Sequence, residues 1–210
     1  MYAKTKIDAE NEILKDHSDD FYPTILRFAT VFGHSRRMRF DLVVNLFAAQ
    51  AYHNGVITVT GANQWRPFIH VTDVAQAVVD TLDAPIQKIS RQIFNIGDDR
   101  LNISIGDLAQ QVAEVIKLSK RKVKVMVKTK NNVTDRRNYS VSFHKVTQNL
   151  DFHSSIGLTD GIREIYHHMK NHDYTKPYTN SIYSNLEMTK VLQKEFYSEN
   201  YHKSHLTYAE

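Results

Sequence analysis

Apolar residues follow two patterns along this chain. Some segments have the periodicity of an amphipathic α-helix, and others are short continuous runs typical of buried strands. Residues 2–16 set Ile7 and Ile13 among charged residues, as in an amphipathic helix with one face on a core. The helical periodicity predicts further helices at 40–52, 72–82, 104–118, 142–150, 159–169 and 186–196. Apolar runs predict strands at 24–29, 56–59, 67–70, 92–96 and 122–128. Strands that alternate with helices indicate the α/β class.

Two of the predicted helices carry start signals. Thr72 is expected to cap the helix at 72–82, with Asp73 in its first turn, where a carboxylate faces the positive end of the helix dipole. Ser104 and Asp107 have the spacing of a capping box. The Thr72 signal follows the apolar run at 67–70 closely, as in the short strand-to-helix connections of α/β folds.

The composition indicates a folded protein without covalent cross-links. Hydrophobic residues make up 41% of the 210 residues, enough for a core, and there is no cysteine for a disulfide or a thiolate metal site. No apolar run is long enough to cross a bilayer, and the start of the chain is too polar for a signal peptide. We therefore expect a cytoplasmic protein with no membrane partner. The eleven histidines show no zinc-binding spacing, so no metal site is expected.

The net charge is +4, and seven lysines and arginines stand within residues 117–130. Such a run suggests a nucleic-acid-binding domain. No aromatic residue interleaves with it to stack on bases, and its lysines alternate with valines as on the solvated face of a strand. We therefore rank nucleic acid last among the candidate partners.

Tyr2 and Lys6 stand four residues apart, and one helical turn places them on one face of the predicted helix. An ammonium group beside a phenol favours the phenolate and lowers the pKa of the tyrosine. A phenolate held over a hydroxyl group of a substrate is a general base. The alternative is a solvated pair on a surface helix, which the spacing alone does not exclude.

Two arginines stand in segments suited to anion binding. Arg66 leads the apolar run at 67–70, and Arg137 stands in a predicted loop at 135–139. The planar fork of arginine forms paired, charge-assisted bonds to phosphate, so two arginines that converge would hold a diphosphate. Solvated surface arginines are the alternative, because the sequence does not show whether the two segments meet.

Six motifs stand in one order along the chain: Tyr2-x-x-x-Lys6, then residues 26–33, 36–45, 65–75, 94–97 and 135–142. Together they resemble the C-terminal part of an extended short-chain dehydrogenase/reductase, specifically an NAD-dependent epimerase/dehydratase that acts on nucleotide sugars. The resemblance covers residues 1–170. It implies a Rossmann-like α/β fold, of which this chain holds the last sheet strands, at 24–28 and 92–96, and the small mixed α/β substrate lobe. Residues 171–210 are expected to form a partly helical tail.

The resemblance implies roles for the pair near the start of the sequence. Tyr2 is the expected base, taking the proton from a sugar hydroxyl as hydride leaves for NAD, with NADP as the alternative cofactor. Lys6 is expected to bind the cofactor ribose and to lower the pKa of Tyr2. Phe28 and Ala29 are expected to line the cofactor site.

The resemblance also implies residues that bind the substrate, a nucleotide-diphosphate sugar. Arg66 and Arg137 are expected on the diphosphate, Thr30 on the sugar and Asn45 on the nucleotide. Many relatives have asparagine at the position of Thr30. The identity of the sugar, and the choice between epimerisation, dehydration and reduction, stay open.

The sequence contains no G-x-G-x-x-G turn, the element that holds the cofactor pyrophosphate in this family. We therefore expect that the chain alone neither binds NAD measurably nor turns over. It is then either a fragment of such an enzyme or one product of a split gene, with a separately encoded N-terminal half as its partner. A homodimer through the helix at 2–16 is a second expected assembly. The alternative function is a non-catalytic remnant that binds a nucleotide sugar or a partner protein.

Overall fold

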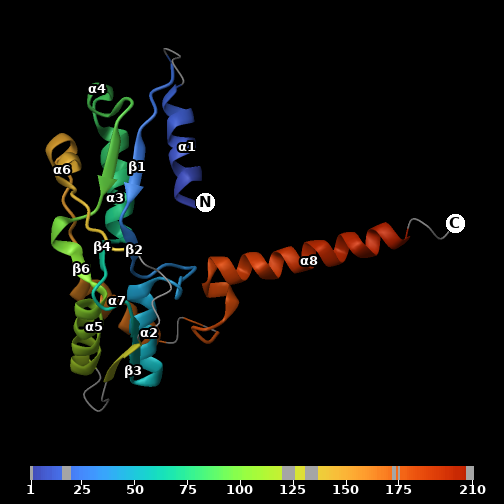
Figure 1. The fold of residues 1–210 in the computed structure, drawn as a ribbon. Coiled ribbons are helices and arrows are strands. Elements are labelled where there is room, and N and C mark those ends of the chain that lie inside the picture. The colour runs from blue at the N-terminus through green and yellow to red at the C-terminus, as the bar shows by residue number, and fades with distance from the viewer. Residues whose placement is uncertain are drawn as a thin grey trace.

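The computed structural model describes residues 2–15, 20–119, 126–130, 137–171, 174 and 176–206 (Figure 1). Its α-helices are α1 (Tyr2–Lys15), α2 (Val43–Asn54), α3 (Val71–Asp83), α4 (Ile86–Ile89), α5 (Ile105–Ser119), α6 (His144–Leu150), α7 (Leu158–Lys170) and α8 (Asn185–Leu206). Its strands are β1 (Ile25–Phe28), β2 (Thr30–Phe32), β3 (Val56–Thr60), β4 (Trp65–His70), β5 (Ile93–Ile96), β6 (Asn102–Ser104) and β7 (Met126–Lys130). The described residues also form the 3₁₀ helices η1 (Asp99–Leu101) and η2 (Ser181–Tyr183). The predicted α/β class is confirmed.

The described strands form small sheets in which parallel pairing dominates. β1 and β5 pair in parallel, with Phe28 opposite Ile96, so the strands predicted near 24–28 and 92–96 are neighbours. β4 lies between β2, which is parallel to it, and β6, which is antiparallel. β3 and β7 form a further parallel pair. The carboxyl ends of β1 and β5 therefore lie at one sheet edge, which is where open α/β sheets bind ligands.

The main core lies between three helices. α2, α5 and α7 pack against one another (Figure 1), and their apolar faces meet in one cluster that includes Phe47 and Ile162. A second cluster joins β5, α3 and α6 through Phe94, Ala77 and Val146. The first cluster builds the lobe beside the β1–β5 sheet, and the second covers that sheet.

The start signals predicted for two helices have different outcomes. The Ser104 signal is confirmed, because its Oγ accepts a hydrogen bond from the Asp107 backbone N–H at 3.0 Å. The prediction for Thr72 is wrong: α3 is capped by His70, whose ring accepts from the Thr72 N–H at 3.3 Å. His70 is also the last residue of strand β4, and histidine is not a usual N-cap residue. Nothing in the sequence therefore marks it as the cap of α3.

Helix α2 begins later than its pattern predicts, and only part of the strand predicted at 122–128 lies within the described residues. The chain before Val43 is held in a loop, because the Phe40 N–H donates to the Tyr183 carbonyl at 3.1 Å. The strand predicted at 122–128 is described as β7 from Met126, and residues 120–125 lie outside the described residues.

The segment after α7 first packs on the lobe, and the chain then extends away from the lobe in α8. Tyr183 of η2 belongs to the main core cluster, and α8 then points away from the rest of the fold (Figure 1). α8 runs beyond the predicted end at 196, since no glycine or proline interrupts residues 185–206. None of the described helices combines the length and the apolar character that a membrane span requires. The division of the chain at residue 170 stays a prediction.

Candidate functional site

An ion pair fixes helix α1 against strand β1. The Glu10 carboxylate accepts hydrogen bonds from Arg27 Nε at 2.9 and 3.2 Å, and a further one from Nη2. The hydrogen bond from Arg27 lowers the pKa of Glu10 below its ordinary value, so the carboxylate is charged at neutral pH. Figure 1 shows the result: α1 lies along β1, with its first turn level with the carboxyl end of the strand.

Positions 2, 6 and 10 stand one helical turn apart and share the face of α1 that meets β1. Residue 2 is eight residues before Glu10, about 12 Å along the helix axis. β1 runs in the opposite direction (Figure 1), so Thr30, three residues after Arg27, lies about 10 Å further the same way. The backbone of residue 2 is therefore level with Thr30. The Tyr2 side chain lies outside what the structure describes, and Lys6 is exposed.

A hollow of about 290 Å³ opens at the carboxyl end of β1. It is lined by Arg27, Phe28, Ala29, Thr30, Pro67, Asn95, Tyr139, Val141 and Phe143. Phe28, Ala29 and Thr30 are the residues predicted to line the cofactor and the sugar. The structure thus gathers all three in one concave site, and their roles stay predictions.

Arg66 and Arg137 belong to segments that meet. Arg66 in β4 is buried, and its Nη1 donates to the carbonyl oxygens of Trp65 at 2.7 Å and of Arg137 at 2.6 Å. The Arg66 guanidinium carbon lies 5.1 Å from the ring centre of Tyr139. Arg137 is exposed. The two segments therefore meet at the Arg66 guanidinium, and the joint binding of a diphosphate by the Arg66 and Arg137 side chains stays a prediction.

Asn45 is not among the residues that line the hollow. It is 3% exposed, its Nδ2 donates to the Arg39 carbonyl at 3.1 Å, and its Oδ1 accepts from the Gly33 N–H at 3.3 Å. Gly33 has a φ of +113°, a conformation that favours glycine. Both ends of the Asn45 amide therefore hold the loop at 33–39, and nucleotide binding by Asn45 stays a prediction.

A partly buried group of hydrogen bonds around Glu164 joins the loop at 33–39 to helix α7. The Glu164 carboxylate accepts a hydrogen bond from the His34 N–H at 3.0 Å and lies 2.8 Å from His70 Nε2. His70 Nδ1 accepts from the Thr72 N–H, so Nε2 carries the proton and donates to Glu164. Burial raises the pKa of Glu164, but the hydrogen bonds from His34 and His70 outweigh burial, and the pKa lies below its ordinary value.

Replacing Glu164 with glutamine is expected to destabilise the fold by about 1–3 kcal/mol at pH 7, because the buried His70 N–H loses its charged acceptor. The carboxylate stabilises the fold above its ordinary pKa of 4.5, and this contribution is lost as the pH falls through the lowered pKa. The difference between wild type and variant should therefore shrink below pH 4.5. Urea unfolding at several pH values measures it.

Glu187→Gln is the matched control, since Glu187 pairs with Lys190 on the exposed surface of α8. An exposed pair contributes little, so this variant should unfold within about 0.5 kcal/mol of wild type. A Glu164→Gln difference that stays constant from neutral to acidic pH would contradict the role of the Glu164 charge.

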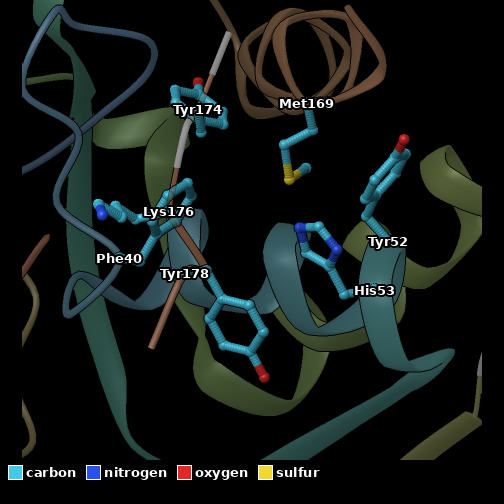
Figure 2. A pocket seen from close by; sticks show the side chains of 7 residues that line it. All are labelled: Phe40, Tyr52, His53, Met169, Tyr174, Lys176 and Tyr178. Atoms are coloured by element: carbon cyan, nitrogen blue, oxygen red, sulfur yellow. The ribbon is translucent and has the colours of Figure 1, made fainter. Parts of the chain in front are cut away.

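A second cavity, of about 190 Å³, lies between α2, α7 and the segment at 174–178 (Figure 2). It is lined by Phe40, Tyr52, His53, Met169, Tyr174, Lys176 and Tyr178. The His53 and Tyr178 rings stack with centres 5.6 Å apart, and Asn54 Nδ2 donates to the Tyr178 hydroxyl at 2.7 Å. These contacts join the tail to the lobe, and the cavity contains none of the predicted site residues.

Sequence reasoning missed several residues of the hollow. Tyr139 stands two residues after Arg137, so an aromatic residue beside a candidate anion-binding arginine was the available signal. Asn95 and Phe143 carry no local signal, because they reach the hollow through the pairing of β5 with β1 and the return of the chain before α6.

The paired strands β1 and β5, with the adjoining lobe and the hollow at their carboxyl ends, form the mixed α/β fold that the resemblance to the C-terminal part of an extended short-chain dehydrogenase/reductase predicts. The resemblance found in the sequence is confirmed over part of the chain. Residues 1–97 match the model of the NAD dependent epimerase/dehydratase family.

Solved structures support the same fold. RMD from Pseudomonas aeruginosa, complexed with NADPH, has a TM-score of 0.68 and 16% identity over 81% of this chain and 56% of its own. UDP-glucose 4-epimerase from Thermotoga maritima, with UDP-glucose, has a TM-score of 0.62 and 18% identity over 80% of this chain and 52% of its own. UDP-glucuronic acid 4-epimerase from Bacillus cereus, with UDP-glucuronic acid and NAD, has a TM-score of 0.58 and 23% identity over 70% of this chain and 45% of its own.

The chain thus spans about half the length of the solved structures that it matches. At these identities the likeness shows the fold. The complexes with NADPH and NAD agree with NAD(P) as the cofactor of the family.

Proposed function

We propose that this chain supplies the base, part of the cofactor site and the diphosphate site of an NAD(P)-dependent nucleotide-sugar epimerase or dehydratase. The observation that carries the proposal is the ion pair of Glu10 with Arg27, which sets the helix face of Tyr2 and Lys6 level with Thr30 in the hollow. This geometry supports a base on α1 that acts on a substrate in the hollow.

In this proposal each residue has one task. Tyr2 takes a proton from a sugar hydroxyl, and Lys6 favours the phenolate form that accepts it. Bound NAD(P) supplies the acceptor for hydride. Arg66 and Arg137 neutralise and orient the diphosphate of the substrate, as arginine forks do for phosphate groups.

The residues present fit one end of the cofactor. Phe28 and Ala29 give the hollow an apolar wall, and its volume of about 290 Å³ suits a single ring or sugar. The glycine-rich turn that cradles a pyrophosphate is absent from the 210 residues. We therefore infer that another polypeptide segment holds the pyrophosphate.

The surface around β1 suits such a segment. Within the described residues β1 pairs with β5 alone, so its other edge presents N–H and C=O groups to a further strand. Large apolar side chains are exposed on β1, α1 and α3: Ile7, Ile13, Phe28, Val79 and Leu82. A β–α–β unit would cover this surface, and a second copy of α1 is the alternative occupant.

A non-catalytic role is the second candidate function. The contact between the Arg66 and Arg137 segments and the hollow lie within this chain, whereas the glycine-rich turn is not in its sequence. Binding of a nucleotide sugar therefore needs fewer elements than turnover does.

Calorimetric titration of the full chain with UDP-glucuronic acid, UDP-glucose and GDP-glucose tests the binding that both candidates share. We expect binding of at least one, with a Kd about tenfold higher for Arg137→Met, because a charge-assisted contact to phosphate is lost. Arg163→Met is the matched control, since Arg163 is exposed and pairs with Asp160 on α7. No binding by wild type would overturn both candidates. Turnover after mixing with a polypeptide that carries the glycine-rich β–α–β unit would separate the enzyme from the binding protein.

A further inference from the structure

We propose that Tyr139 is a positioning residue that holds the Arg66 guanidinium toward the diphosphate and marks the boundary between the diphosphate and sugar parts of the site. The inference rests on the proposed function. It assigns a task to an aromatic residue that belongs to none of the predicted site residues.

Tyr139 contacts both parts of the site. The Arg66 guanidinium carbon lies 5.1 Å from the Tyr139 ring centre, within the range of a cation–π contact. The same tyrosine lines the hollow together with Thr30 and Phe28 at the end of β1. A ligand with its sugar in the hollow and its diphosphate near Arg66 would therefore pass beside Tyr139.

The backbone around Tyr139 is fixed by strand β4 and by Asn102, the first residue of β6. The Tyr139 N–H donates to the Trp65 carbonyl at 3.4 Å, and Asn138 Oδ1 accepts from the Trp65 N–H at 2.9 Å. Two residues on, the Val141 N–H donates to Asn102 Oδ1 at 2.9 Å, and Asn102 Nδ2 donates to the Val141 carbonyl at 3.0 Å. The ring of Tyr139 is thus carried on a segment that is held on both sides.

Two kinds of contact restrain the Arg66 guanidinium: hydrogen bonds from one nitrogen and the Tyr139 ring beside its plane. Its Nη1 donates to the Trp65 and Arg137 carbonyls, which anchors one end of the fork. The Tyr139 ring packs near the guanidinium carbon and limits rotation of the plane about that anchor. Paired recognition of phosphate oxygens depends on the orientation of this plane, so loss of the ring would weaken binding while the anchor remains.

The test compares Tyr139→Leu with Tyr139→Phe in the full chain. NMR of the arginine side-chain N–H groups reads the position of Arg66 without any ligand. In wild type and Tyr139→Phe we expect the Arg66 Nε–H signal displaced by the ring current, and in Tyr139→Leu we expect that displacement to be lost. An Arg66 signal that is the same in all three proteins would overturn the positioning role.

Calorimetry with UDP-glucuronic acid then reads the consequence for binding. We expect a Kd about five- to tenfold higher for Tyr139→Leu, the effect of one cation–π contact on the orientation of the fork, and a Kd within about twofold of wild type for Tyr139→Phe. Equal affinity of wild type and Tyr139→Leu would overturn the inference alone. No binding by wild type to this or the other nucleotide sugars would overturn the proposed function and the inference with it.

Discussion

Replacing Tyr2 with phenylalanine is expected to lower turnover by a factor of about 10² to 10⁴, the usual effect of removing a general acid–base group. The assay uses this chain in complex with a polypeptide that carries the glycine-rich β–α–β unit, and it follows conversion of the nucleotide sugar by chromatography. Phenylalanine keeps the ring of Tyr2 but has no hydroxyl to exchange a proton. The loss should therefore appear in kcat, with KM changed by less than about threefold.

Tyr22→Phe is the matched control for this substitution, because Tyr22 is 50% exposed and lies outside the hollow. It should leave turnover unchanged. Lys6→Met adds a second measurement: under the proposed role of Lys6, loss of the ammonium should move the pH of half-maximal turnover upward. Turnover of Tyr2→Phe within threefold of wild type would show that Tyr2 is not the base.

Replacing Gly161 with valine is expected to destabilise the fold by about 3 kcal/mol, at the upper end of the cost of overpacking a core. A Cβ at this position of α7 would lie 2.4 Å from Phe32 Cε2 and 3.1 Å from His70 Cδ2. Phe32 is 1% exposed and packs edge-on against Phe68 and His70, so its ring has no free space to enter. Urea unfolding measures the difference.

Gly157→Val is the matched control, because nothing lies within 4 Å of a Cβ at Gly157, at the start of the same helix. It adds the same atoms to open space and should cost at most about 1 kcal/mol, from a less favourable N-cap. Equal destabilisation by the two variants would show that the close contact of α7 with Phe32 does not set the stability.

The helices and strands were predictable where their residues bury a face with a regular period. α5 buries residues at helical spacing and begins at the Ser104 signal, so both its existence and its start follow from local sequence. The cap of α3 was not predictable in the same way. His70 ends a strand and accepts the Thr72 N–H only because the strand and the helix follow each other without a loop.

The site was predictable where its residues are close in sequence. Phe28 and Thr30 stand at the carboxyl end of the strand predicted at 24–29, which is where ligands bind in such folds. The contact between Arg66 and Arg137 joins residues 71 positions apart, and the bond between His34 and Glu164 joins residues 130 apart. Residue type alone does not specify such a meeting, because strand register and helix packing decide it.

The ion pair between α1 and β1 also has a consequence for how the protein folds. Glu10 and Arg27 are 17 residues apart, whereas His70 and Glu164 are 94 apart. The entropy cost of closing a loop grows with its length, and chains rich in local contacts fold faster. During synthesis the helix that carries Tyr2 and Lys6 can therefore dock on its strand before residue 164 has been made.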